Sequence, residues 1–399
     1  MSIPFEFVLF ALTLLSVALF HRFAMHSALA GALVIVGYKL VFADFHGVPG
    51  LTGLAHLLGE EWALLTNLFG LLTGFALLSA HFEESRLPER LPDFLPDNWL
   101  GGFLLLVIVF LLSGFLDNIA AAIIGGSVAA TIFRGRVHIG YLAGLTAASN
   151  AGGAGSVLGD TTTTMMWIDG VSPFDVLHAY LPAATALLVF GIPAALRQHR
   201  HSPIAAISPV GLHIDWVRAG IVGFVLFSLI SANVTANLKL EGGAESLPIL
   251  GMTLWLALLI ASPLRRPNFA LVPEAVRGSL FLLALVFAAS MMPVESLPDA
   301  SWQVALGLGF LSAVFDNIPL TKLALDAGGY DWGFLAYAVG FGGSMIWFGS
   351  SAGVALSNRF PEARSAMQWL RHGWHIAIAY VAGFMVLLWL WGWQPHPAH

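Results

Sequence analysis

Three aspartates lie inside long apolar segments of the sequence: Asp117, Asp160 and Asp316. Even on a lenient insertion scale, a charged side chain near the middle of a bilayer costs about 2.5–3.5 kcal/mol. Three such costs indicate a function, and embedded oxygen ligands suit Na⁺ or Li⁺. Carboxylates that share a low-dielectric pocket also titrate as a coupled group, so they can exchange a cation for protons near neutral pH. We therefore expect these three side chains to be ligands of a transported metal ion.

Each aspartate also has a purely structural interpretation. Asp160 precedes the run Thr161–Thr164 and can cap a half-helix, an interaction worth about 1 kcal/mol. Asp117 and Asp316 can likewise cap the return arms of two hairpins. Capping and cation binding are compatible, and we favour the combination. Lys322 follows six residues after Asp316 and is either a counter-charge for the site or a lysine that snorkels to the membrane interface.

The remaining candidate ligands are polar and glycine positions beside these aspartates, since hydroxyls, freed carbonyls and half-helix termini are natural ligands for a small ion. In the first half of the chain they are Asn118, Asn150, Gly152, Gly153, Ser156, Gly159, Thr161 and Thr162. In the second half they are Asn317, Thr321, Gly342, Gly343, Ser344, Gly349, Ser350 and Ser351. Glu60 and Glu61 form either a cation funnel or an ordinary interfacial pair, and we favour the second.

Composition indicates the environment of these residues. Of 399 residues, 58% are hydrophobic and only 10% are charged, against about 25% charged in soluble domains. A mean hydropathy of +0.82 predicts an all-α polytopic membrane protein with about a dozen spans in the lipid bilayer. The net charge of −6 excludes nucleic acid as a partner, and the lack of cysteine excludes disulfides and thiolate metal sites.

The apolar run at 99–133 is too long for a single crossing. As one straight helix its 35 residues would measure about 52 Å, whereas the hydrocarbon core is about 30 Å thick. An arginine pair flanks the run on each side, and both pairs stay on one face only if the run is a re-entrant hairpin. The pairs are Arg86 with Arg90 and Arg134 with Arg136.

A second hairpin at 301–325 completes the predicted topology. With both termini outside, the inside loops carry the loop arginines and the outside loops carry only Lys239, in agreement with the positive-inside rule. This arrangement predicts a multi-pass protein of a bacterial inner membrane.

An internal repeat relates the two halves of the chain. Leu112–Ala120 is echoed by Leu311–Pro319, with an offset of 316 − 117 = 199 residues, and Gly152–Asp160 resembles Gly342–Ser350. Because the predicted hairpins open to opposite sides, we expect an inverted-topology repeat, 1–199 and 200–399.

Glycine-rich stretches interrupt two further spans, 139–168 and 332–357. Glycine costs about 1 kcal/mol against alanine in a helix, so each span is predicted to be a broken helix with an unwound centre. Small residues in membrane helices can also be simple packing seams. Their recurrence at matched places beside embedded carboxylates favours an ion site.

Four stretches resemble the signatures of the ion-transporter superfamily, and most of all those of NhaD-type sodium/proton antiporters. They are Ser149–Gly153, Gly159–Trp167, Asp316–Thr321 and Gly349–Leu356. The resemblance implies a homodimer with an elevator movement, in which two hairpins and two broken helices form a mobile unit. Aspartate stands at both hairpin tips where the superfamily's carboxylate carriers have serine, which favours a cation substrate. The first tip departs from the antiporter pattern, with alanines in place of Pro and Thr.

The expected function is secondary active exchange of Na⁺ or Li⁺ for H⁺ by alternating access at a buried carboxylate site. The alternative is a sodium-coupled carrier of a small carboxylate or oxyanion in the same fold. An enzyme is not expected, because the sequence has no HExxH and no cysteine nucleophile. No cofactor is expected besides the transported ions.

The hairpin at 99–133 can be tested by labelling, because the chain contains no cysteine. Single cysteines beside Arg90 and beside Arg134 are expected to react with an impermeant maleimide from the same face, since a re-entrant segment returns to the side it entered. Right-side-out and inside-out vesicles provide the measurement, and a cysteine beside Lys239 is the control for the opposite face. Labelling from opposite faces would contradict the topology.

Overall fold

The computed structural model describes residues 4–20, 23–204, 213–239 and 247–396. Within these ranges the regular secondary structure is helical apart from one short hairpin, in which β1 (Asp44–Phe45) pairs antiparallel with β2 (Val48–Pro49). Six of the described helical segments are long and apolar enough to cross a membrane. The prediction of an all-α polytopic membrane protein is therefore confirmed.

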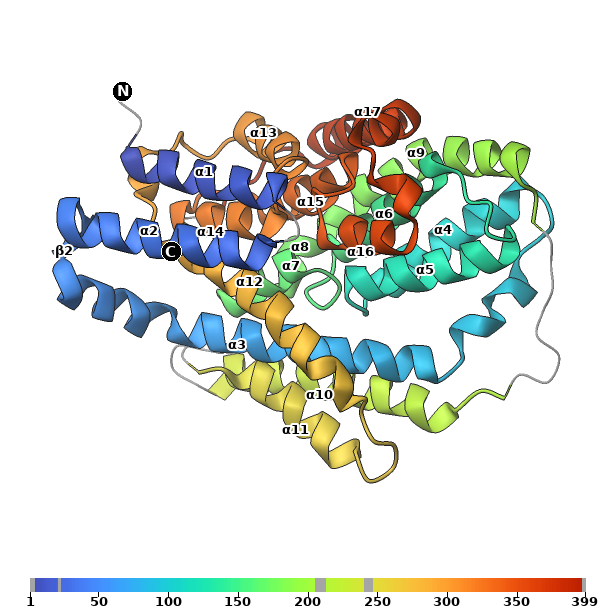
Figure 1. Cartoon of the computed structure of the whole chain (residues 1–399), viewed down its shortest axis with the longest axis horizontal. Helices are drawn as coiled ribbons and strands as arrows, with labels where there is room; N and C mark the ends of the chain where they lie inside the picture. The colour runs from blue at the N-terminus through green and yellow to red at the C-terminus, as the bar shows by residue number, and fades with distance from the viewer. Residues whose placement is uncertain (1–3, 21–22, 205–212, 240–246, 397–399) are drawn as a thin grey trace.

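Six helices form what we call the outer group. They are α1 (Phe5–Leu19), α2 (Ala24–Phe42), α3 (Gly50–Glu84), α10 (Trp216–Lys239), α11 (Ile249–Ala261) and α12 (Val272–Ser290). Helix α3 packs against α10, α11 and α12, while α2 packs against α1 and α12. Figure 1 shows α3 running along most of the molecule, with α10 and α11 below it and α12 crossing it obliquely. Its 35 residues make α3 about 52 Å long, so it contacts the rest of the protein at several depths.

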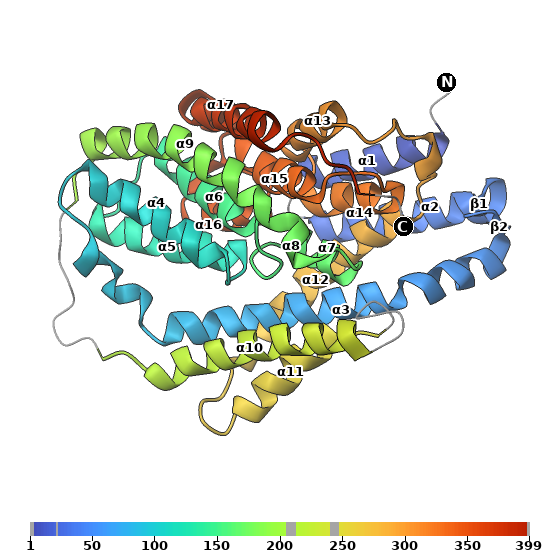
Figure 2. The same ribbon diagram turned by 180° about the vertical axis from the view of Figure 1, so that it is seen from behind.

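The other α-helices form what we call the inner group, seen from behind in Figure 2. Its first part comprises α4 (Trp99–Ser113), α5 (Asn118–Ile132), α6 (Ile139–Gly153), α7 (Thr161–Ile168), α8 (Pro173–Val176) and α9 (Tyr180–His201). Its second part comprises α13 (Trp302–Ser312), α14 (Asn317–Ala327), α15 (Trp332–Gly342), α16 (Ser351–Arg359) and α17 (Ala366–Trp391). The two groups meet where α14 packs against α12, and where α7 and α5 pack against α3.

The segment predicted to be the first hairpin consists of two helices in contact, α4 and α5, of 15 residues each. The turn between them ends at Asp117, which holds the N-cap position of α5. The second predicted hairpin consists of α13 and α14, of 11 residues each. There the carboxylate of Asp316 caps α14 by accepting a hydrogen bond from the backbone N–H of Ile318 at 3.1 Å.

Both glycine-rich spans are interrupted as predicted. Helix α6 ends at Gly153 and α7 begins at Thr161, with Asp160 as its N-cap. Helix α15 ends at Gly342, a 3₁₀ turn follows over Gly343–Met345, and α16 begins after its N-cap Ser350. An N-cap side chain accepts hydrogen bonds from the first free N–H groups of a helix. Asp160 does so at the start of α7 and Ser350 at the start of α16, at corresponding positions of the two breaks.

Close backbone contacts explain why glycine stands at the end of each first half-helix. A Cβ on Gly152 would overlap the carbonyl oxygen of Phe110 in α4, and a Cβ on Gly342 would overlap that of Gly309 in α13. Each broken helix therefore presses its interrupted end against the first arm of a hairpin. This packing brings the hairpin tips and the helix breaks to the same region of the molecule.

Candidate ion-binding site

A hydrogen-bonded network joins the first hairpin tip to both helix breaks. The amide nitrogen Nδ2 of Asn118 donates to Oδ1 of Asn150 and to Oδ1 of Asp160, both at 3.2 Å. The amide of Asn150 donates in turn to Oγ of Ser344 at 2.9 Å and to Oγ of Ser350 at 3.0 Å. Asn150 thus connects α6 to the break between α15 and α16, about two hundred residues away in the chain.

The second hairpin tip joins the same network from the other side. Nδ2 of Asn317 donates to the hydroxyl of Thr162 at 3.0 Å, and that hydroxyl donates to Oδ2 of Asp160 at 2.7 Å. Asp160 is therefore reached from both hairpins, directly from Asn118 and through Thr162 from Asn317. Seven candidate residues from the sequence meet in this way.

Burial makes Asp160 the most constrained of the three aspartates. Only 2% of it is exposed, and its hydrogen bonds come from one amide, one hydroxyl and the N–H of Thr162. Removing a charged group from water is very costly unless it is paired and hydrogen-bonded. Neutral donors and a helix N-terminus stabilise the carboxylate only in part, so a bound cation or proton would complete its environment.

Two cavities reach these carboxylates. A small one of about 20 Å³ is lined by Asp117, Asp160, Thr161, Thr164 and apolar side chains, several of them from α3. A volume of this size accommodates roughly one water-sized particle. A larger cavity of about 590 Å³ lies between the outer and inner groups, and Asp117 lines both cavities. The site is therefore adjacent to a space of the size of ordinary small-molecule pockets.

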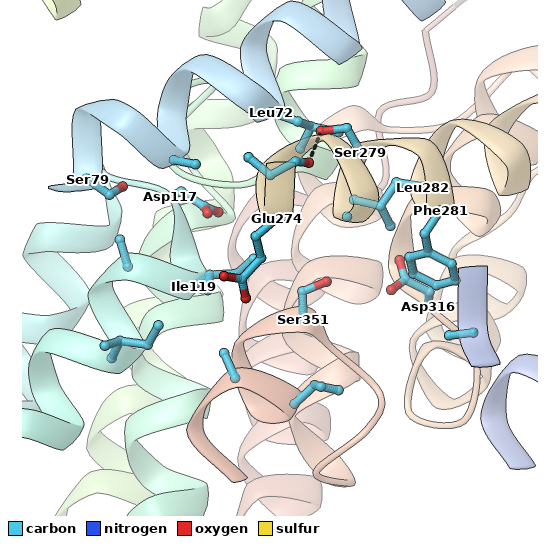
Figure 3. Close-up of a pocket in the computed structure, with 18 of the residues that line it drawn as sticks. Leu72, Ser79, Asp117, Ile119, Glu274, Ser279, Phe281, Leu282, Asp316 and Ser351 are labelled. Atoms are coloured by element: carbon cyan, nitrogen blue, oxygen red, sulfur yellow. Dashed lines mark hydrogen bonds between the residues drawn. The ribbon is translucent and has the colours of Figure 1, made fainter. Parts of the chain in front are cut away.

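The larger cavity carries acidic groups on both of its walls. Asp117 and Asp316 come from the two hairpin tips of the inner group, whereas Glu83 and Glu274 come from α3 and α12 of the outer group. Figure 3 shows Asp117 and Asp316 on opposite flanks of the cavity, with Glu274 and Ser351 between them. No lysine, arginine or histidine is among the described residues that line it. The carboxylates that line the cavity attract cations and repel anions.

Several predicted residues have other surroundings. The hydroxyl of Thr321 donates to the backbone oxygen of Asn317 within its own helix, and that of Ser156 donates to the backbone oxygen of Gly114. Gly153 and Gly343 pack against the last glycine of their own breaks, Gly159 and Gly349. These glycines shape the backbone around the network, and a role as ion ligands stays a prediction.

Lys322 has partners that the sequence did not indicate. Its ammonium forms ion pairs with Glu61 and with Asp326, each at 2.7 Å, and only 4% of the lysine side chain is exposed. Asp316 is not among these partners, and the snorkelling interpretation is wrong because the side chain is buried. Glu61 is 11% exposed, whereas Glu60 is 54% exposed and pairs with His56. The interfacial interpretation of the two glutamates stays a prediction.

Sequence reasoning did not single out Glu83 and Glu274 as cavity residues. Each lies near the end of an apolar run, where an acidic residue is ordinary, so only the packing of α3 beside α12 brings them together. It also did not single out Ser113 and Thr146, whose buried hydroxyl oxygens have no hydrogen-bond partner among the described residues. Ser113 lies at the end of α4, next to the tip, and is a further oxygen available near the site.

Fold and site together define an integral, multi-pass membrane protein in which interrupted helices surround a buried carboxylate. No protein-family model matches the chain. Curated proteins do match it over most of its length. Sodium/proton antiporter 1 of Arabidopsis thaliana is 27% identical over 76% of this chain, which spans 57% of the length of that relative.

Bacterial relatives match a larger share of both chains. The Na⁺/H⁺ antiporter NhaD of Alkalimonas amylolytica is 27% identical over 90% of this chain and 83% of its own length. The protein of the same name from Vibrio cholerae is 26% identical over 80% of this chain and 76% of its own length. The resemblance to NhaD-type antiporters is thereby confirmed. The chain is similar to these antiporters, and the relatives are named as transporters rather than enzymes.

The substitution Asn150→Ala tests whether the network holds the two helix breaks together. It removes the acceptor of Asn118 and the donor to Ser344 and Ser350, and a buried polar group left without a partner costs about 1–3 kcal/mol. We expect a clearly lower unfolding temperature in detergent. The matched control is Asn268→Ala, an exposed asparagine that contacts Glu84 at 3.5 Å, and it should leave the unfolding temperature nearly unchanged. Equal effects of the two substitutions would contradict the network's role.

Proposed function

We propose that the protein exchanges Na⁺ or Li⁺ for H⁺ across a membrane, at a site formed by Asp117, Asp160 and Asp316. The observation that carries this proposal is the small cavity of about 20 Å³ between Asp117 and Asp160. Its volume suits a single desolvated ion or water, and its walls offer carboxylate and hydroxyl oxygens. Two carboxylates that share such a space can hold a cation when ionised and protons when the cation leaves. The names of the relatives agree with this activity.

The site is proposed to work by alternating access. The larger cavity leads to both hairpin tips and lies between the outer and inner groups, which supports a state open to one side. We further propose that the inner group moves against the outer group in an elevator movement and that two chains form a homodimer. The halves 1–199 and 200–399 would then be inverted repeats in a bacterial inner membrane, with both termini outside. Matched N-caps and matched glycine contacts in the two halves support the repeat.

A sodium-coupled carrier of a small carboxylate or oxyanion is the second candidate. The larger cavity, at about 590 Å³, has room for such a solute. However, four carboxylates and no basic side chain line it among the described residues. An anion entering this space would meet charges of its own sign without a compensating cation. The electrostatics therefore support cation exchange over anion transport.

Substitution of each aspartate by asparagine tests the site. Asn caps helices about as well as Asp, so Asp117→Asn, Asp160→Asn and Asp316→Asn should keep the fold while removing the charge that holds a cation or proton. We expect each to lose more than about 90% of Na⁺-driven proton movement, measured with a pH-sensitive dye in proteoliposomes. Asp299→Asn, in an exposed loop, is the matched control. Loss of expression in all three, with no selective loss of transport, would favour a purely structural role.

Competition between Na⁺ and H⁺ gives a test of coupling. If bound Na⁺ displaces one proton from the carboxylates, the apparent Na⁺ affinity weakens as pH falls, approaching about tenfold per pH unit in the range where the free site is protonated. Linkage requires the reciprocal effect of Na⁺ on proton binding. Calorimetry at several pH values, in buffers of different ionisation enthalpy, measures both affinity and released protons. A Na⁺ affinity independent of pH, without proton release, would rule out exchange at one site and favour the carrier.

A further inference from the structure

The three charged side chains around Lys322 connect the two helix groups of the protein. Lys322 and Asp326 lie one turn apart on α14, in the inner group, whereas Glu61 lies on α3, in the outer group. The Lys322–Asp326 pair is thus internal to one helix, and the Lys322–Glu61 pair crosses between groups. Both bonds measure 2.7 Å, and exposure of the three side chains is 4% for Lys322, 11% for Glu61 and 21% for Asp326.

The cross-group bond lies away from the larger cavity along α3. The α3 residues that line this cavity run from Leu72 to Glu83, and Glu61 precedes Leu72 by 11 residues, or about 16 Å along the helix. Around Glu61 the groups are closed on each other, because Leu57 of α3 and Leu323 of α14 are buried in one apolar cluster with α12 and α2. One part of α3 therefore borders an open space, whereas the part around Glu61 reaches α14 through the ion pair and the shared apolar cluster, and α14 packs against α12.

Positions related by the proposed repeat can be compared between the two hairpin arms α5 and α14. With the offset of 199 residues between the hairpin tips, Lys322 corresponds to 322 − 199 = 123, which is Ile123, and Asp326 corresponds to Ser127. Ile123 lines the larger cavity, whereas Lys322 is buried in the ion pairs. The corresponding arms of the two hairpins thus have opposite surroundings, and only the closed one carries a charge that reaches the outer group.

We propose that Glu61 and Lys322 form a latch that closes the transport pathway at the end opposite the larger cavity and must open when that end opens. Its place in a transport cycle rests on the proposed function. When the bond breaks, Lys322 keeps Asp326 as a partner within α14. This matters because a buried charge left unpaired is costly. Because of Asp326, the ammonium of Lys322 still has an ion-pair partner when its bond to Glu61 breaks.

Two substitutions separate a latch from a merely structural ion pair. Glu61→Gln removes the cross-group bond and leaves Lys322 with Asp326, while Asp326→Asn removes the bond within α14 and leaves Lys322 with Glu61. Each deletes one carboxylate from the same lysine, so they are matched controls for each other. Glu60→Gln, next to Glu61 but exposed, controls for position on α3.

The readout is labelling of single cysteines by an impermeant maleimide. One reporter is Leu57→Cys, buried beside the latch, and the other is Ala355→Cys, which lines the larger cavity. We expect Glu61→Gln to raise the labelling rate at position 57 at least fivefold and to lower it at position 355. Asp326→Asn and Glu60→Gln should stay within twofold of the parent protein. If Glu61→Gln does not fold, Glu61→Asp, with the same carboxylate one methylene shorter, takes its place with the same expectation.

The outcomes distinguish this inference from the proposed function. Unchanged labelling with Glu61→Gln, or an equal change with Asp326→Asn, would overturn the latch. The double substitution Glu61→Lys with Lys322→Glu keeps one cation and two carboxylates, and it should restore the parent's labelling at both positions. Na⁺-driven proton movement is measured in the same vesicles. If Glu61→Gln shifts the labelling but the parent protein shows no Na⁺/H⁺ exchange, the latch is retained and the exchange activity is rejected. If the parent protein exchanges Na⁺ for H⁺ but Glu61→Gln leaves the labelling unchanged, the exchange activity is retained and the latch is rejected.

Discussion

The cost of holding a carboxylate away from water is the constraint on which the rest of this structure depends. Asp160 is almost fully buried, and its oxygens need donors that an uninterrupted membrane helix cannot supply, because every N–H in its interior already has a partner. The helix breaks solve this problem. Because α6 ends at Gly153 and α7 begins at Thr161, the N–H and the hydroxyl of Thr162 can both donate to the carboxylate of Asp160.

The same breaks explain how four distant segments converge. Interrupted helix ends can approach one another more closely than whole helices, because glycine at Gly152 and Gly342 permits backbone contact with the hairpin arms. The side chains of Asn118, Asn150 and Asn317 then bridge the remaining gaps. Amides suit this place because each offers both donors and an acceptor without adding charge. The result is a polar centre that couples both halves of the chain.

The two predicted hairpins nevertheless have different surroundings in the structure. Asp117 lines both cavities, whereas Asp316 lines only the larger one. The arm that follows the first tip borders the larger cavity, while the arm that follows the second tip packs against α12. The charged contacts of Lys322 occur only on the second of these arms.

The sequence by itself determined the helical membrane class, the places where helices are interrupted and most of the polar side chains that meet at the centre. These features are local: apolar length, glycine content and an aspartate before a threonine run each act within a few residues of the chain. Tertiary structure alone decided which side chains share a cavity and which partner a charge takes. Lys322 pairs with Glu61, 261 residues earlier, and Glu83 faces the same space as Glu274. Such pairings depend on how α3 packs against α12 and how α12 packs against α14, which no short stretch of sequence encodes.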